Sequence, residues 1–237
     1  MQYKTELHAH TREVSPCADL TAPEVAERFL AAGYTSLVVT NHYCDYVVDN
    51  AGESWEEKMD YYLLPYRKMQ EYAKGRLNVL LGLELRFLEN FNDYLVYGVD
   101  EQFLHDYPDL HKMSLKTFAP FAKEHGLLVI QAHPFRNRMT VMNPKLLDGV
   151  EVFNGHKGHD SRNPVADMWA KRYGLLRASG SDCHHPDSEE SGGILTEQPI
   201  TSVSQLVETL RTGNCILHCS GTAAALDGMV DMPAKYD

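Results

Sequence analysis

One short pattern recurs along this 237-residue chain and limits how it can fold. Apolar, strand-forming residues run for a few positions, and each run ends at a histidine, a glutamate or an aspartate. The runs are Tyr3–Leu7 before His8 and His10, Val38–Asn41 before His42, Leu80–Leu83 before Glu84, Val129–Ala132 before His133, and Ala178–Ser181 before Asp182 and His184. Because the carboxyl ends of parallel strands meet at one rim of a barrel, we expect these polar side chains to converge.

Helical segments separate these runs. Thr21, with Glu24 three residues later, has the pattern of a capping box that begins a helix over about 22–32. A second helix is expected over about 54–74, where Pro65 predicts a kink or a break. Strands that alternate with helices in this way are typical of an α/β fold with a parallel sheet.

The remaining stretches lack a helical or strand period. Residues 43–52 and 100–111 are predicted to be irregular, and the chain beyond residue 221 to be loosely ordered. No linker is long or biased enough to divide the chain. We therefore expect one domain over residues 1–237, with a core of about 3–220 closed into a (β/α) barrel.

The composition excludes some classes of function. With 33 acidic residues against 22 lysines and arginines, the net charge is −11, which disfavours nucleic-acid polymers as partners but permits a small anion beside bound cations. The five cysteines are scattered, so a reducing compartment fits better than a disulfide framework. The N-terminal MQYKTELHAH has no apolar signal core, and no apolar run approaches the roughly 20 residues of a membrane span. A cytoplasmic protein without a membrane partner is expected, and the oligomeric state is left open.

The convergent side chains are typical metal ligands. His8 and His10 lie at i and i+2, so on a strand they share a face. The full set offers five imidazoles and two carboxylates, which is too many donors for one zinc ion and suits two metals. Glu84 is the candidate bridge because it is the only ligand-type residue at the end of its strand. Asp182 could hold a metal and also orient the attacking water, and His184 follows it at i+2.

Five motifs carry a family resemblance. They are His8-x-His10, Thr40-Asn41-His42, Gly82-Leu83-Glu84, Ala132-His133-Pro134 and Ser181-Asp182-Cys183-His184. Together, in this order, they resemble the polymerase and histidinol phosphatase (PHP) superfamily over about residues 3–220. The resemblance implies a distorted (β/α)7 barrel, two or three divalent metal ions (zinc, manganese or iron) and hydrolysis of phosphoric esters.

The sequence departs from the family pattern at several positions. Asn41 stands where the family usually has aspartate. The acid that usually follows the first His-x-His is matched to Asp19, with Glu13 as the rival. A further histidine is expected near the strand after Glu84, and that region has none. Either Asp93 or Asp100 replaces it, or the third metal site is weak or absent.

The predicted reaction is direct hydrolysis by a metal-bridging hydroxide, with Glu84, Asp182 and His184 in the catalytic centre. The expected substrate is a small phosphorylated metabolite: a phosphomonoester such as histidinol phosphate or a nucleotide, or a small phosphodiester. Arg136 follows His133-Pro134, and Arg162 lies in a later polar loop. Both are candidates to bind the phosphate, because a guanidinium can contact two of its oxygens.

Three other functions compete with this prediction. Amidohydrolase-like C–N hydrolases also use His-x-His on a barrel, but they commonly bridge their metals with a strand-end lysine, and none is expected here. A nuclease is disfavoured by the net charge of −11. An inactive metal-binding scaffold is disfavoured by the complete set of predicted ligands.

Overall fold

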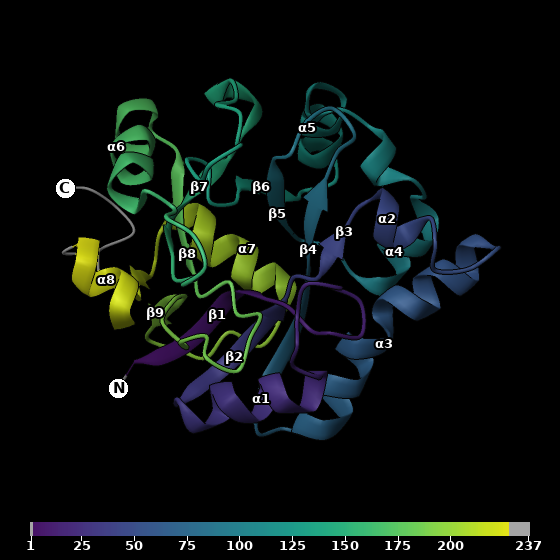
Figure 1. Cartoon of the computed structure of the whole chain (residues 1–237), viewed down its shortest axis with the longest axis horizontal. Helices are drawn as coiled ribbons and strands as arrows, with labels where there is room; N and C mark the ends of the chain where they lie inside the picture. Colours follow the sequence, from purple (N-terminus) through teal and green to yellow (C-terminus); the bar gives the residue numbers. More distant parts are fainter. Residues whose placement is uncertain (1, 228–237) are drawn as a thin grey trace.

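The computed structural model describes residues 2–227, and its strands form one curved sheet that nearly closes into a barrel (Figure 1). The barrel strands are β1 (Tyr3–Ala9), β2 (Tyr34–Val39), β4 (Asn78–Arg86), β5 (Asp93–Tyr97), β6 (Leu128–Gln131), β7 (Gly149–Asn154) and β8 (Leu176–Gly180), in that spatial order. A bridge between Ala9 and Cys183 joins the chain just beyond β8 to the end of β1. The predicted distorted α/β barrel is confirmed.

Short strands extend this sheet. β3 (His42–Tyr43) pairs with β4, and β9 (Ile194–Thr196) pairs antiparallel with β1. β10 (Ile216–Leu217) then pairs antiparallel with β9. These additions lie beside the barrel strands and leave their order unchanged.

The direction of β5 matters for the site. β5 runs antiparallel to both neighbours, β4 and β6, whereas β1, β2 and β4 are parallel to one another. Asp93, the first residue of β5, therefore lies opposite Arg86, the last residue of β4. This reversal brings the start of β5 to the same rim as the carboxyl ends of the parallel strands.

Helices surround the strands. They are α1 (Ala22–Ala31), α2 (Asp45–Val48), α3 (Trp55–Ala73), α4 (Glu101–Asp106), α5 (Leu115–Glu124), α6 (Asn163–Tyr173), α7 (Val203–Thr212) and α8 (Gly221–Asp227), with 3₁₀ turns at Leu110–Lys112 and Pro144–Leu146. Figure 1 shows α1, α3, α5 and α6 around the outside. α7 packs against both β5 and β8, and Arg211 donates to the Gly126 carbonyl at 2.9 Å, so α7 covers the end of the barrel opposite the ligand-bearing rim. None of the described helices is long and apolar enough to cross a membrane.

Local sequence signals explain most helix boundaries. The Thr21 side chain accepts from the Glu24 amide while the Glu24 carboxylate accepts from the Thr21 amide, as the capping box predicts. The predicted break at Pro65 is wrong, because α3 continues through that residue. Neighbouring packing can override the helix-breaking preference of proline, and Pro65 is buried here.

The three stretches expected to be irregular contain short helices. α2 forms within 43–52 because its Val47 and Val48 side chains are buried. α4 forms within 100–111 because the Asp100 side chain caps it by accepting from the Phe103 amide at 2.7 Å. α8 lies within the expected loose tail, whose remaining residues 228–237 are outside the described part of the chain.

Candidate metal centre

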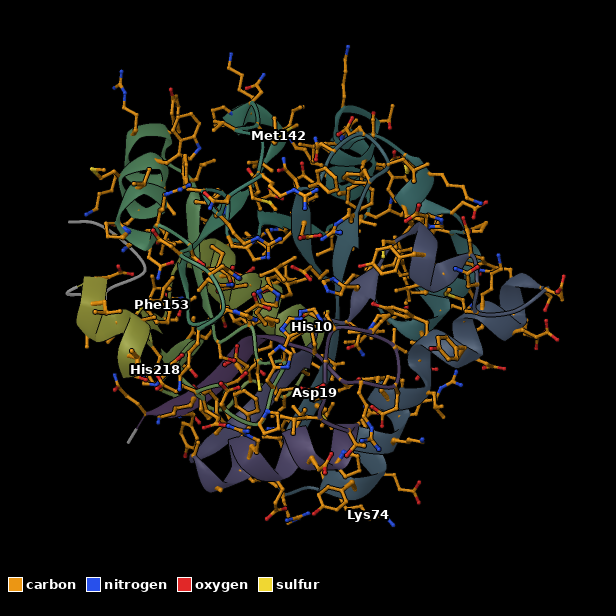
Figure 2. All side chains as sticks on the ribbon, viewed as in Figure 1. His10, Asp19, Lys74, Met142, Phe153 and His218 are labelled. Atoms are coloured by element: carbon orange, nitrogen blue, oxygen red, sulfur yellow. The ribbon has the colours of Figure 1, made fainter. Side chains whose placement is uncertain are left out.

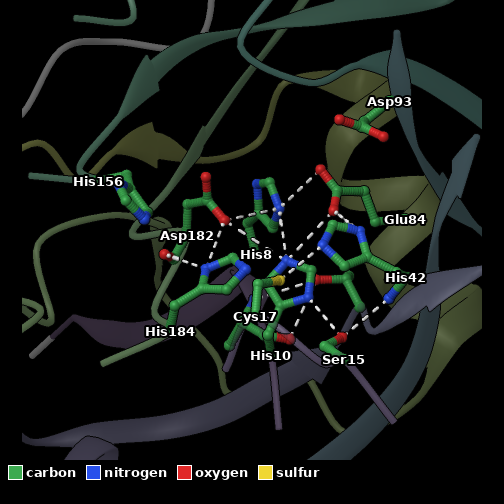
Figure 3. A network of polar contacts seen from close by, with 12 residues as sticks. His8, His10, Ser15, Cys17, His42, Glu84, Asp93, His156, Asp182 and His184 are labelled. Carbon is green, nitrogen blue, oxygen red and sulfur yellow. Dashed lines mark hydrogen bonds and ion pairs between the residues drawn. The ribbon is translucent and has the colours of Figure 1, made fainter. Parts of the chain in front are cut away.

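His8, near the end of β1, and His10, directly after it, point into the rim of the barrel, where both side chains are fully buried (Figure 3). Their Nε2 atoms lie 3.1 Å apart. Asp182, just beyond β8, places its Oδ1 3.3 Å from His8 Nε2 and 3.5 Å from His10 Nε2. Residues more than 170 positions apart in the sequence thus share one cluster, because barrel closure places β8 beside β1.

The Glu84 carboxylate occupies the middle of the centre. Oε1 lies 3.3 Å from His8 Nε2 and 3.2 Å from His133 Nε2, and Oε2 lies 3.3 Å from His10 Nε2 and 2.7 Å from His42 Nδ1. One carboxylate therefore contacts four imidazoles that come from three segments: the end of β1, β3 and the chain after β6. This is the geometry that a bridging carboxylate between two cations needs.

Two further groups complete the ring of donors. Asp93 Oδ2 lies 3.8 Å from His133 Nε2 and forms a potential ligand cluster with His42 and Glu84. His184 Nδ1 lies 3.2 Å from Asp182 Oδ1, and its ring stacks on that of His10 at a centroid distance of 4.0 Å. The structure thus brings together His8, His10, His42, Glu84, His133, Asp182 and His184, with Asp93 added.

Several donor atoms of the centre lack well-oriented hydrogen-bond partners in the described part of the chain, and a divalent cation could take the place of those partners. Glu84 Oε2, Asp182 Oδ1 and His42 Nδ1 are buried and have no well-oriented hydrogen bond among the described residues. Buried polar atoms without such bonds are costly, and a cation would satisfy all three. Imidazole and carboxylate donors suit zinc, manganese and iron alike.

Electrostatics distinguish the imidazoles. Burial and the neighbouring His184 and His42 hold the pKa of His10 well below its usual value, which leaves a lone pair for a cation. Burial also opposes the charging of His42 and His184, but Glu84 and Asp182 respectively raise their pKa values to about 10. In the absence of cations the carboxylates therefore keep protons on these rings, and metal binding would release those protons.

The Nδ1 atoms of His8 and His10 are held by neighbouring side chains. Glu151, on β7, places Oε1 2.8 Å from His8 Nδ1, and its Oε2 accepts from the His133 amide at 2.9 Å. Ser15 Oγ lies 3.0 Å from His10 Nδ1. Gly180 leaves room for this arrangement, because a side chain there would overlap His8 and Glu151. These contacts aim both Nε2 atoms at Glu84.

Cys17, which was not predicted, also lies at the site. Its Sγ lies 3.2 Å from His42 Nε2, and it lines the same pocket as His184. Partial burial raises the pKa of the Cys17 thiol, but hydrogen bonds with His184 and His42 lower it to about 6. The prediction from the sequence named only acids in the loop after the first His-x-His. It therefore missed Cys17 as a candidate thiolate ligand.

Two predicted ligands lie at strained backbone positions. His133 has φ +29° and Asp182 has φ +51°, in the left-handed region that side chains other than glycine rarely adopt. Such conformations typically cost about 1–3 kcal/mol each and cluster at functional sites. Here they turn the chain sharply at the ends of β6 and β8, where both side chains enter the centre.

The other acids considered from the sequence lie elsewhere. The Asp19 carboxylate contacts His185 Nδ1 at 2.8 Å, and 65% of its side chain is exposed. Figure 2 labels Asp19 among all the side chains. Glu13 accepts from the Ala22 amide at the start of α1, and Asp100 caps α4. The Asp19 amide donates to the His184 carbonyl at 2.9 Å, but the structure places the carboxylate of Asp93, and of none of these three acids, among the candidate ligands.

Arginines line one side of the pocket above these ligands, which has a volume of about 340 Å³. Arg136 reaches into it, with Nη2 3.4 Å from Asp93 Oδ2. Arg86, which was not predicted, also lines it and contacts Asp93 through Nε at 2.7 Å and Nη2 at 2.9 Å. Arg162 instead donates to the Phe135 carbonyl and to Asn137 Oδ1, both at 2.6 Å, and so supports the loop that carries Arg136.

Comparison with known proteins gives a fold but no close relative. No protein-family model matches the sequence, and a search of curated proteins found no similar sequence. A two-domain Bacteroides vulgatus protein containing a predicted PHP-like metal-dependent phosphoesterase aligns with a TM-score of 0.65 at 18% identity, over 92% of this chain and 65% of that protein. This chain has a PHP-like fold. It spans less than two thirds of that larger protein.

Two other solved structures share the fold of this chain. PsfC from Pseudomonas syringae aligns with a TM-score of 0.61 at 14% identity, over 94% of this chain and 93% of PsfC. An amidohydrolase from Chromobacterium violaceum, solved with sulfate and no metal, aligns with a TM-score of 0.54 at 17% identity, over 87% of this chain and 96% of that one. The fold therefore occurs with more than one named chemistry, and the function has to be argued from the site.

Proposed function

We propose that this chain is a metal-dependent phosphoesterase that hydrolyses a small phosphorylated metabolite. The observation that carries the proposal is the Glu84 carboxylate in contact with His8, His10, His42 and His133. A carboxylate so placed suits two cations bound side by side, and two-metal centres are typical of phosphoester hydrolysis. The PHP-like neighbour from Bacteroides vulgatus supports the same class.

The donors divide into groups that use each side chain once, apart from the bridge. His8, His10 and Asp182 form one group, and His133 and Asp93 form a second, with Glu84 shared between them. The remaining donors, His42 and His184, lie beside Cys17 and form a third group. We propose two divalent ions at the first two groups and a third at the last.

The chain's own residues bind and orient the reactants. Bound divalent ions would supply charge neutralisation for the phosphate and a lowered pKa for water. Arg136 would hold a non-bridging phosphate oxygen from the side of the pocket. Asp182, whose Oδ1 has no well-oriented hydrogen bond among the described residues, would orient the attacking water, and His184, whose Nδ1 lies 3.2 Å from that oxygen, would hold the Asp182 carboxylate in position.

The metal pocket favours this reaction over C–N hydrolysis. Its lining contains six histidines, Glu84, Asp182 and two arginines, together with Cys17 and Tyr46, and no lysine. The shared position that a strand-end lysine would take in an amidohydrolase-like centre is held by Glu84. A nuclease remains disfavoured by the net charge of −11, and the scattered cysteines suit a cytoplasmic enzyme.

The test is elemental analysis by plasma mass spectrometry, paired with phosphate release from a panel of phosphomonoesters. We expect two or more metal ions per chain and turnover in the wild type. Glu84→Gln keeps the shape but removes the bridging charge, so kcat should fall by about 10³-fold or more and metal content should drop.

Asp19→Asn is the matched control, because Asp19 contacts His185 and lies outside the donor cluster. It should keep both metal and activity. If Asp19→Asn loses metal as Glu84→Gln does, the ligand set above is wrong. If metal-loaded wild type releases phosphate from no ester in the panel, the phosphoesterase proposal fails.

A further inference from the structure

A second pocket adjoins the metal pocket. It has a volume of about 390 Å³ and is lined by Arg86, Phe91, Arg136, Asn137, Arg138, Met139 and His159. We call it the outer pocket. Arg86, Arg136 and His159 line both pockets, so the two pockets lie side by side. A ligand bound at the metal centre can therefore extend into the outer pocket.

The outer pocket is positively charged within an acidic protein. Arg86 and Arg136 both pair with the single carboxylate of Asp93, which leaves one guanidinium charge uncompensated. Arg138 adds a further charge: it stacks on the Phe91 ring at 4.2 Å and forms no ion pair among the described residues. The pocket lining contains no carboxylate. The local charge is therefore opposite in sign to the net −11 of the chain.

The loop that carries these arginines is held from both sides. Arg162 donates to the Phe135 carbonyl and to Asn137 Oδ1. Asn92 accepts from the Thr140 amide at 2.7 Å and donates to its carbonyl at 2.9 Å. Residues 135–140 are therefore anchored near both ends. Because the loop is already ordered, less conformational entropy is lost when the arginines bind a ligand.

One phosphate does not account for all three arginines. A phosphate bound over the metal ligands can contact Arg86 and Arg136, which line that pocket. Arg138 lines the outer pocket but not the metal pocket. A guanidinium that stacks on an aromatic ring keeps its N–H edge available for an anion. The third charge thus points to a second anionic group on the ligand.

We propose that the outer pocket binds a second anionic group of the substrate, so that the substrate is a phosphoester that also carries another phosphate or a carboxylate. The inference rests on the proposed phosphoesterase function for the group at the metal centre. Arg138 is the residue that determines this specificity, assisted by Arg86 and Arg136. Uncharged alcohol esters of phosphate would be hydrolysed less efficiently.

The experiment compares substrates that differ by one anionic group. Fructose 1,6-bisphosphate is paired with fructose 6-phosphate, and 3-phosphoglycerate with glycerol 3-phosphate, at fixed ionic strength. A charge-assisted contact predicts about a tenfold higher kcat/KM for the doubly anionic member of at least one pair. Arg138→Ala should remove that advantage, mainly through KM, and leave the singly anionic member within about twofold.

Two variants serve as controls. Arg138→Lys keeps the charge but loses the planar fork, and should retain part of the advantage. Arg172→Ala removes an exposed guanidinium on α6, away from both pockets, and should retain all of it. If the second anionic group gives the wild type no advantage, or if Arg138→Ala slows both members equally, the outer pocket is not a specificity site, whereas turnover of the monoesters would still support the proposed function.

If no ester in either pair is hydrolysed, a binding measurement distinguishes the outer-pocket inference from the phosphoesterase proposal. Calorimetric titration of the metal-free protein with fructose 1,6-bisphosphate should show saturable binding that Arg138→Ala weakens about tenfold. Such binding without turnover would support the outer pocket and count against the phosphoesterase. Binding that does not depend on Arg138, or none, would overturn the inference.

Discussion

The metal centre and the outer pocket are built in different ways. The histidine, glutamate and aspartate donors of the metal centre come from β3, β4 and β5 and from the ends of β1, β6 and β8, and their side chains are almost fully buried. The outer pocket takes two of its three arginines from one loop after β6, and about a quarter of the Arg86 and Arg136 side chains is exposed. The barrel rim therefore determines the positions of the metal ligands. Changes in a single loop can alter the substrate specificity without moving those ligands.

The largest effect that separates the two regions is expected from Glu151→Gln. The carboxylate holds His8 Nδ1 and the His133 amide, but it lines neither pocket. Loss of its charge should weaken metal affinity by about 10–100-fold, as is typical for groups that orient a metal-bound histidine. The advantage of doubly anionic substrates should survive at saturating metal.

Metal titration of Glu151→Gln, followed by the paired-substrate assay, checks both parts. Glu208→Gln, an exposed glutamate on α7, is the control. Unchanged metal affinity in Glu151→Gln would show that His8 is oriented by the barrel backbone without help from Glu151. Loss of the substrate preference as well would mean that the two regions are not separable.

Cys17→Ser should have a smaller effect, confined to one ion. Cobalt(II) bound by the wild type should give the near-ultraviolet charge-transfer band of a cobalt–thiolate bond, because Cys17 Sγ lies 3.2 Å from His42 Nε2. The variant should lose the band and bind one cobalt ion about tenfold more weakly, since serine is the harder and weaker donor. Cys215→Ser, whose side chain lines a different pocket, should keep the band. A band that persists in Cys17→Ser would remove Cys17 from the ligand set.

The barrel and most of the centre were predictable because they depend on a repeated local pattern. A strand followed by a ligand needs only strand propensity and the rule that parallel strands end at one rim, which located residues such as His8, Glu84 and Asp182. Asp93 remained one of two alternatives, because the residues Asp93–Tyr97 predict a strand without its direction. Only the antiparallel pairing of β5 brings its first residue to the rim.

The residues that were missed depend on tertiary contacts. Cys17 lies in a loop without periodicity, and Glu151 is a single carboxylate within a buried strand, so neither has a local signal. Arg86 is different: it follows Glu84 at i+2 on β4 and therefore shares its face, which the sequence could have shown. The role of Arg162 required the position of a loop 25 residues away in the chain.

Arg162→Ala should have the smallest effect and the most selective one. The variant removes two hydrogen bonds to residues 135 and 137, so the loop would lose order while every metal ligand stays in place. We expect metal content to be unchanged and the preference for doubly anionic substrates to fall about two- to fivefold, because ordering Arg138 around the ligand then costs more on binding. Paired kcat/KM values, with metal content measured on the same samples, check this. If turnover of the singly anionic esters fell by the same factor, Arg162 would act on the shared phosphate, as the sequence first indicated, and the division between a rigid centre and an adjustable loop would not hold.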